Sequence, residues 1–205
     1  MDIILKLKEE LNVEKWQVEA AVKLIDEGNT IPFISRYRKE ATGSLNDEVL
    51  RNLDERLTYL RNLEEKKEQV LKSIEEQGKL TDELKERIVA AETMVVVEDL
   101  YRPYRPKKKT RASVAKEKGL DGLAQFILAQ ETTEPIENEA EKYIREDEDA
   151  AKTVKTAAEA LQGAKDIIAE MVSDEADYRI YIRNITTEEG TLVSAAKDEK
   201  AESVY

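Results

Sequence analysis

An uninterrupted helical pattern from Leu45 to Gln77 constrains the fold of this chain more than any other feature. The segment contains neither Gly nor Pro, and its apolar residues recur mostly every three or four positions, so they lie on one face of an α-helix. At about 1.5 Å per residue this helix is roughly 50 Å long. We therefore expect neighbouring segments to pack along it. The apolar positions are Leu45, Val49, Leu53, Leu57, Leu60, Leu71 and Ile74.

The composition favours helices throughout the chain. The 205 residues include seven Gly and four Pro, and 38% of the residues are charged. Because helix breakers are scarce, we predict an all-α fold: an elongated multi-helix domain built on the long central helix. The three valines within Met94–Tyr101 favour a strand. A lone strand among helices would have no partner, so we expect a helix there as well.

The long helix also suits the seam of a coiled-coil dimer. Its apolar stripe is wider than a strict two-position heptad pattern, and short connectors follow it. These features favour an intramolecular hairpin, so we expect a monomer.

The residue types that are missing exclude several classes of chemistry. The chain has no Cys and no His, which excludes thiol nucleophiles, disulfides, Cys/His zinc sites and imidazole bases. It has no Gly-rich phosphate loop and no metal-ligand spacing. We therefore expect no enzyme activity, no catalytic or metal-binding residue and no cofactor. No apolar run approaches the ~18–20 residues of a membrane span and no signal peptide opens the chain, so we expect a cytoplasmic protein without a membrane partner.

Charge is distributed very unevenly. The net charge is −12, yet eight cations and one anion lie between Arg102 and Lys118. A cationic stripe on an acidic chain attracts a polyanion at one place and repels it elsewhere. Two prolines beside Tyr101 and Tyr104 keep the stripe extended and offer rings for base stacking. The candidate nucleic-acid-binding residues are Arg102, Tyr104, Arg105, Lys107, Lys108, Lys109 and Arg111.

A second basic cluster, Arg36, Arg38 and Lys39, follows an apolar turn expected at 31–34. These residues are further candidates for phosphate contact. A structural role remains the alternative for each cluster. In the basic stripe, the cations would neutralise neighbouring acidic helices and the tyrosines would pack on a helix. In the second cluster, the arginines would lay their stems on the apolar turn and pair with carboxylates. If six cations of the stripe contacted one strand, the salt slope would be at most about −4, so binding would be weak at physiological salt.

The rest of the sequence predicts a series of shorter helices. Thr81 is the expected cap of a helix that ends near residue 92. Two helices at about 111–118 and 122–130 flank Gly119 and suggest a helix-turn-helix-like unit. The second of them carries no Lys or Arg, which favours a packing role over reading of a DNA groove.

We divide the chain into an N-terminal helical domain, 1–130, an acidic linker, 131–149, and a C-terminal helical segment, 150–205. Two subdomains, 1–130 and 150–205, are the alternative to one domain. Within the C-terminal segment we expect helices at 150–172 and from residue 174, a short strand at 192–195, and a final helix over the last dozen residues.

Several long motifs resemble the N-terminal region of the Tex family, bacterial transcription accessory proteins that carry an S1 RNA-binding domain. They read GNTIPFISRYRKE at 28–40, ATG at 41–43, EEQGKL at 75–80 and EDLYRPYRPKKKTRA at 98–112, with looser matches at 163–170 and 188–194. The resemblance implies an all-helical N-terminal domain with helix-turn-helix character in a larger nucleic-acid-binding protein. It also implies a fragment, since Tex proteins continue into ribonuclease-H-like, helix-hairpin-helix and S1 domains.

Residues and resemblance together lead to one expected function and one alternative. The expected function is a helical scaffold in a transcription accessory protein, with the basic segment as an auxiliary phosphate contact. Nucleic acid would then bind weakly to this fragment and more strongly to the full protein. The alternative is a module that docks a protein of the transcription or translation machinery and makes no direct contact with nucleic acid.

Overall fold

The computed structural model describes residues 1–106 and 108–195. Within these residues the chain forms α-helices, two short 3-10 helices and one isolated β-bridge but no sheet, which confirms the predicted all-α fold. The chain divides into two compact units, Met1–Tyr104 and Arg105–Tyr205. None of the helices in the described ranges is long and apolar enough to cross a membrane.

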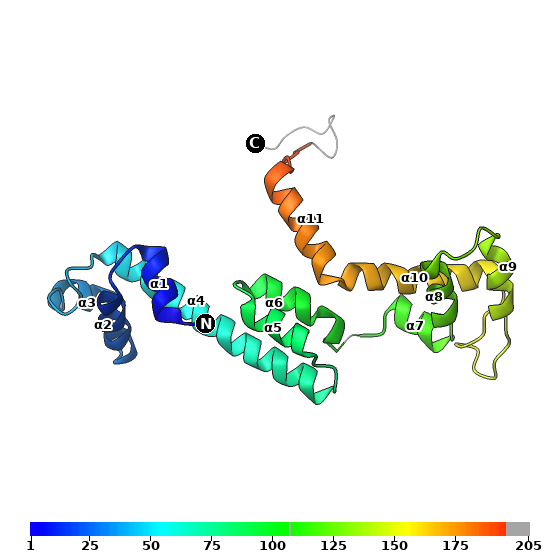
Figure 1. Ribbon diagram of the computed structural model, residues 1–205, viewed down its shortest axis with the longest axis horizontal. Coiled ribbons are helices and arrows are strands. Elements are labelled where there is room, and N and C mark those ends of the chain that lie inside the picture. Colours follow the sequence, from blue (N-terminus) through cyan, green and yellow to red (C-terminus); the bar gives the residue numbers. More distant parts are fainter. Residues whose placement is uncertain (107, 196–205) are drawn as a thin grey trace, which may run out of the picture. The chain divides into compact units, whose positions relative to one another are not determined.

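The first unit is organised on α4, the predicted long helix. The helices α1, α2 and α3 contact one part of α4, and α5 and α6 contact another (Figure 1). Their bounds are α1 Ile3–Leu11, α2 Lys15–Asp26, α3 Ile31–Tyr37, α4 Asp47–Glu76, α5 Asp82–Ala90 and α6 Met94–Tyr101. The helix α6 confirms that the three valines are helical; Val97 is fully buried in the first unit, whereas Val95 is 49% exposed.

Local sequence signals set both ends of these helices. The Asn46 side chain accepts a hydrogen bond of 2.8 Å from the Val49 backbone N–H, so α4 begins at Asp47, slightly later than expected. Thr81 caps α5 as predicted. The apolar stripe of α4 is fully or almost fully buried, and it consists of Leu50, Leu53, Leu57, Leu60, Leu63, Val70 and Ile74.

Bidentate ion pairs connect α1 and α2 to α4. Arg56 donates to both carboxylate oxygens of Glu10 at 2.6 and 2.8 Å, and Arg61 does the same to Asp26 at 2.7 and 2.8 Å. The hydrogen bonds from these arginines lower the pKa of Glu10 and of Asp26. A lowered carboxyl pKa stabilises the fold above the unfolded-state pKa, and this stability is lost as the pH falls through the folded-state value.

The ammonium group of Lys67 is buried inside the first unit, where its side chain is 4% exposed. It donates to Glu64 at 2.8 Å and to the backbone carbonyl of Val89, in the last turn of α5, at 2.9 Å. Glu64 also accepts a hydrogen bond from the amino group of Met1 at 2.9 Å. Burial raises the pKa of Glu64, but the hydrogen bonds from Lys67 and Met1 outweigh it and hold that pKa below its ordinary value.

We expect Lys67→Met to lower the free energy of unfolding of the first unit by about 1–3 kcal/mol, because it leaves a buried carbonyl and a partly buried carboxylate without their donor. Urea unfolding followed through Trp16, the one tryptophan in the sequence, measures this loss. Lys72→Met on the exposed face of α4 is the matched control and should cost less than about 0.5 kcal/mol. Equal losses in the two variants would contradict a special role for Lys67.

The segment that precedes α4 is held against α2 by Trp16 and Gln17. The backbone of Gly43 has φ +62°, and a Cβ at this position would lie 2.4 Å from the Trp16 ring. The Gln17 amide donates to the carbonyls of Thr42 and Gly43 at 3.3 and 3.1 Å. Both the left-handed backbone and the close ring therefore require glycine in the ATG motif.

The apolar turn expected at 31–34 is wrong, because these residues form the first turn of α3. Pro32 lies at the helix start, where a missing N–H costs nothing and its fixed φ favours the helix. Ile34 is fully buried. The basic residues that follow are therefore at the C-terminal end of a short helix and in the segment just after it.

Gly43→Ala should destabilise the first unit more than Gly28→Ala does. Gly28 also has a positive φ, +83°, but nothing lies within 4 Å of a Cβ built there. The left-handed backbone therefore lowers the free energy of unfolding by about 1–2 kcal/mol in both variants. In Gly43→Ala, displacement of the Trp16 indole lowers it further, by about 1–3 kcal/mol. Thermal unfolding measures the difference, and the emission of Trp16 should shift in Gly43→Ala alone. Equal losses would show that Trp16 does not pack on Gly43.

The second unit is organised on α10. The helices α7, α8 and α9 pack on α10, and α11 follows it. The bounds are α7 Arg111–Glu117, α8 Asp121–Ala129, α9 Ile136–Ala140, α10 Ala157–Asp174 and α11 Ala176–Glu189. A Cβ at Gly163 would lie 2.3 Å from a methyl carbon of Leu120 and 3.2 Å from the Cβ of Ala115, so this glycine allows close contact between α10 and the α7–α8 segment.

The boundary between the units differs from the one expected near residue 130. The helices flanking Gly119 are confirmed, but they belong to the second unit because they bury small apolar residues against α10. This core contains Ala112, Ala115, Leu120, Leu123, Ala124, Ala140, Val154, Ala160, Ala164 and Ile167. The helix-turn-helix-like character of this segment stays a prediction.

The stretch 131–149, expected to be a linker, is partly ordered into the second unit. It contains α9 and the 3-10 helix η2, Glu141–Tyr143, and Arg145 forms a β-bridge with Val154. The helix expected from residue 150 begins at Ala157 because Thr156 caps it. Residues 192–195 form no strand. The final helix expected over the last dozen residues falls almost entirely on 196–205, outside the described residues.

Candidate nucleic-acid interface

The first part of the basic segment belongs to the first unit and continues α6 as the 3-10 helix η1, Arg102–Tyr104. The hydroxyl groups of Tyr101 and Ser73 are hydrogen-bonded at 3.0 Å. The Gln77 amide donates to the backbone carbonyl of Tyr104 at 2.9 Å. Both tyrosines are half-buried, and the contact of Tyr101 with α4 matches the packing alternative better than base stacking. Arg102 is exposed.

The second part of the basic segment precedes α7 in the second unit. Arg105, Lys108 and Lys109 are exposed, whereas Lys107 lies outside the described residues. A capping box ends the segment: Thr110 Oγ1 accepts from the Ser113 N–H at 3.0 Å, and Ser113 Oγ accepts from the Thr110 N–H at 2.9 Å. The cap fixes the start of α7 and therefore the position of the cations next to it.

Neutralisation by nearby acidic groups is incomplete in this segment. Lys109 lies 3.5 Å from Glu117, but both side chains are more than half exposed, so this pair contributes little. Lys108 and Arg111 make no hydrogen bond or ion pair with any described residue. These two cations are therefore available to a phosphate even though the chain carries a net charge of −12.

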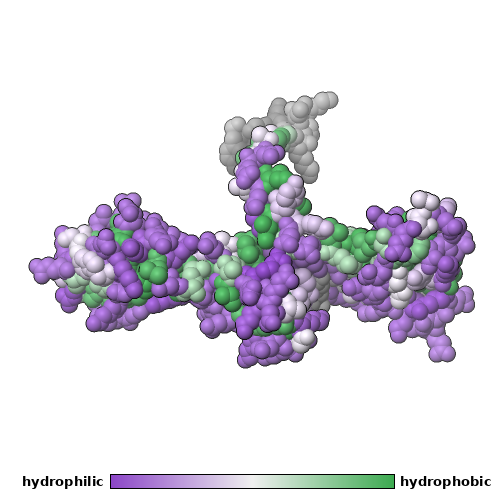
Figure 2. All heavy atoms as spheres, viewed as in Figure 1, coloured by the Kyte–Doolittle hydropathy of each residue, from purple (hydrophilic) through white to green (hydrophobic). Residues whose placement is uncertain are grey.

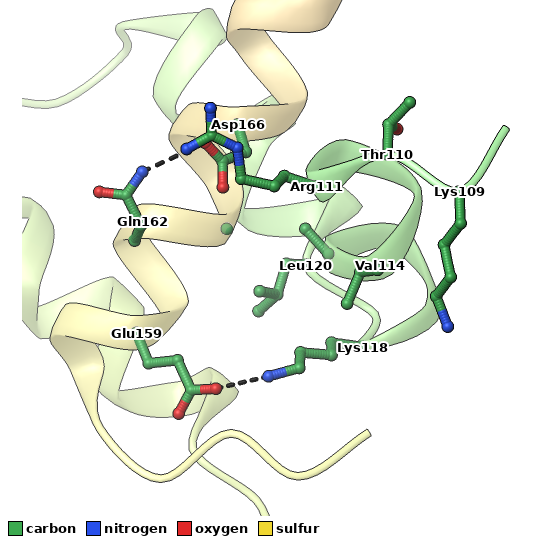
Figure 3. Close-up of a pocket in the computed structure, with 11 residues that line it drawn as sticks. Lys109, Thr110, Arg111, Val114, Lys118, Leu120, Glu159, Gln162 and Asp166 are labelled. Carbon is green, nitrogen blue, oxygen red and sulfur yellow. Dashed lines mark hydrogen bonds and ion pairs between the residues drawn. The ribbon is translucent and has the colours of Figure 1, made fainter. Parts of the chain in front are cut away.

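Lys109 and Arg111 also line a pocket of about 360 Å³ in the second unit (Figure 3). Its apolar lining comes from Val114, Ala115 and Leu120. The wall formed by α10 contributes Glu159, Gln162, Gly163 and Asp166.

Two polar contacts order the lining of this pocket. Lys118 donates to Glu159 at 2.5 Å, and the Gln162 amide donates to Asp166 at 3.2 Å. The hydrogen bond from Lys118, together with one from the Lys155 backbone N–H, lowers the pKa of Glu159. Glu159 therefore stays ionised at neutral pH and neutralises Lys118, which leaves Lys109 and Arg111 as the cations open to a ligand.

The second predicted cluster lies at the end of α3 in the first unit. Arg36, Arg38 and Lys39 are exposed, and none of them pairs with a carboxylate among the described residues. Arg38 donates to the Tyr37 carbonyl at 3.2 Å, and its guanidinium lies 5.1 Å from the centre of the Phe33 ring. The structural ion pairing considered for these arginines is therefore not formed in this part of the chain. Their contact with phosphate stays a prediction.

Sequence reasoning missed the α10 side of the pocket. Glu159 and Lys118 are 41 positions apart, and no local pattern indicates that α10 packs on α7. Gly163 was the available signal, because a glycine inside a helical pattern often marks a close approach of another segment. No group of three or more acidic residues in the described ranges is placed to hold a metal ion.

Comparison with known proteins gives consistent matches. Residues 1–75 match the Tex-like protein N-terminal domain, and residues 130–204 match the Tex central region-like family. The basic segment 102–111 lies between these two matches.

Three curated relatives illustrate the range of similarity. The chain is 49% identical over 177 residues to the transcriptional accessory protein Tex of Neisseria gonorrhoeae, covering 86% of this chain and 22% of that protein. The chain is 46% identical over 192 residues to the protein tex of Bordetella pertussis, and the match covers 94% of this chain and 24% of that protein. It is 31% identical over 185 residues to the human S1 RNA-binding domain-containing protein 1, and this match covers 90% of this chain and 18% of the human protein.

The chain thus spans about a quarter of the length of its bacterial relatives. The two matched regions occur in the order of their names and together cover most of the sequence. The motifs at 28–43 and 98–112 had indicated the same relationship. The chain belongs to the Tex family and carries its N-terminal and central-region sequence.

Proposed function

We propose that this chain is a helical scaffold of a nucleic-acid-binding protein that acts in transcription, and that residues 105–111 contact phosphate as an auxiliary site. Relatives named transcriptional accessory protein and S1 RNA-binding domain-containing protein support the general role. The chain works in the cytoplasm, without catalysis of its own.

One observation carries the phosphate contact: Lys108 and Arg111 are exposed and have no partner among the described residues, although acidic groups outnumber basic ones. A cation that an acidic protein leaves unpaired retains its full attraction for an external anion. Phosphate is the anion that a cluster of Lys and Arg recognises most generally.

The contribution of this site is small compared with that of a dedicated nucleic-acid-binding domain. Each phosphate neutralised on a single strand contributes about −0.7 to the salt slope, so a few cations cannot sustain tight binding at physiological salt. The main contact then belongs to the longer proteins of the family, and this chain positions and supports it.

Fluorescence anisotropy with labelled single-stranded RNA tests the phosphate contact. At low salt the chain should bind, and Lys108→Glu combined with Lys109→Glu should weaken binding at least about tenfold and reduce the salt slope by about 1–1.5. The matched control is Lys72→Glu with Lys79→Glu, two exposed lysines of the first unit, which changes the net charge equally. If both double variants bind equally well, residues 105–111 are not a phosphate site.

A specific observation also favours the protein-docking alternative. Figure 2 shows hydrophobic residues at the surface of α11. The large side chains of Tyr178, Tyr181 and Ile182 on this helix are 54%, 65% and 62% exposed. Exposed apolar clusters of this kind mark interaction surfaces. In this reading a protein of the transcription machinery covers α11. RNA would then fail to bind even at low salt, and the basic segment would be incidental.

A further inference from the structure

The pocket beside α7 has the features of a site for one nucleotide. We infer that it holds a single unstacked base of a bound strand, while Lys109 holds the adjacent phosphate. This inference rests on the proposed function and deepens it, because the site would then recognise a base in addition to attracting phosphate.

The size and floor of the pocket suit a flat ligand. Its volume of about 360 Å³ lies within the range of roughly 300–1,000 Å³ that is typical of small-molecule sites. Val114 and Ala115 from α7, together with Leu120, provide aliphatic contact for the face of a ring. The absence of a side chain at Gly163 keeps the α10 side of the floor open and holds Leu120 close to α10.

The charged groups give the ligand an orientation. Figure 3 shows Lys109 on one side of the pocket, and Gln162, Asp166 and the guanidinium of Arg111 on the other. A phosphate is attracted to Lys109 and repelled by Asp166, so the base must extend toward α10.

The α10 side of the pocket has the chemistry to pair with a base edge. A carboxylate such as Asp166 accepts a hydrogen bond from an exocyclic amino group, and a Gln side chain pairs with adenine. We therefore expect bases with an amino group to fit best, adenine in particular.

The remaining polar groups of the pocket do not compete for this ligand. Lys118 is paired with Glu159, and Arg111 makes no hydrogen bond or ion pair with any described residue. The planar guanidinium of Arg111 can pair with phosphate or stack on a base. The exposed contact of Lys109 with Glu117 at 3.5 Å is weak enough to be exchanged for a phosphate.

Titration with two small ligands tests the site directly. Adenosine monophosphate should shift the methyl NMR signals of Val114 and Leu120, whereas ribose 5-phosphate, which has a phosphate but no base, should leave them in place. Val114→Trp fills the pocket without changing its charge and should abolish the shift of Leu120. Val172→Trp, at a half-exposed valine of α10 outside the pocket lining, is the matched control and should retain it. Equal responses to the two ligands would overturn the inference.

A comparison of two strands separates this inference from the proposed function. At low salt an oligoadenylate should bind about tenfold more tightly than an abasic ribose–phosphate strand of equal length, and Val114→Trp should remove that advantage. If both strands bind equally and both lose affinity in the Lys108→Glu, Lys109→Glu variant, the base pocket is wrong and the phosphate contact stands. If neither strand binds, both proposals fail.

Discussion

The hydrogen bonds of the buried Lys67 ammonium group set how α5 is aligned on α4, and the elements that follow in the first unit depend on this alignment. A buried charge is tolerated only when hydrogen-bonded, and Lys67 has Glu64 and the carbonyl of Val89 as its partners. The apolar stripe of α4 supplies most of the attraction, but apolar packing is non-directional. The hydrogen bond to Val89 adds direction, because it specifies which turn of α5 lies against α4.

That alignment extends to the basic segment. Once α5 is placed, α6 packs beside it on α4, and the contacts of Tyr101 with Ser73 and of Tyr104 with Gln77 fix the end of the first unit. In the second unit the capping box at Thr110 fixes where α7 begins. Lys109 and Arg111, on either side of Thr110, thus lie next to ordered backbone in the second unit, which reduces the entropy lost when such a cation contacts phosphate.

Features set by neighbouring residues could be predicted from the sequence. The long helix and the cap at Thr81 follow from periodicity and capping chemistry. The helical state of Met94–Tyr101 follows from the lack of any partner for a strand, and the structure confirms all three predictions. The start of α3 was missed because Pro32 suggests a turn as readily as the first turn of a helix.

Features set by distant contacts could not be predicted. The division after Tyr104 and the order within 131–149 arise from packing on α10, which no local pattern specifies. The cationic side of the candidate site was identified from charge alone. The opposite wall, with Gln162 and Asp166, could be identified only from the structure, because these residues follow the basic segment by some fifty positions.

Lysine acetylation footprinting by mass spectrometry, with and without single-stranded RNA at low salt, tests the central claim most directly. It reports on each lysine of the unmodified sequence in one experiment. The account predicts that RNA protects Lys108 and Lys109 while Lys72 and Lys79 on the first unit react as before. Equal protection of both pairs, or protection of neither, would contradict a phosphate site in the basic segment.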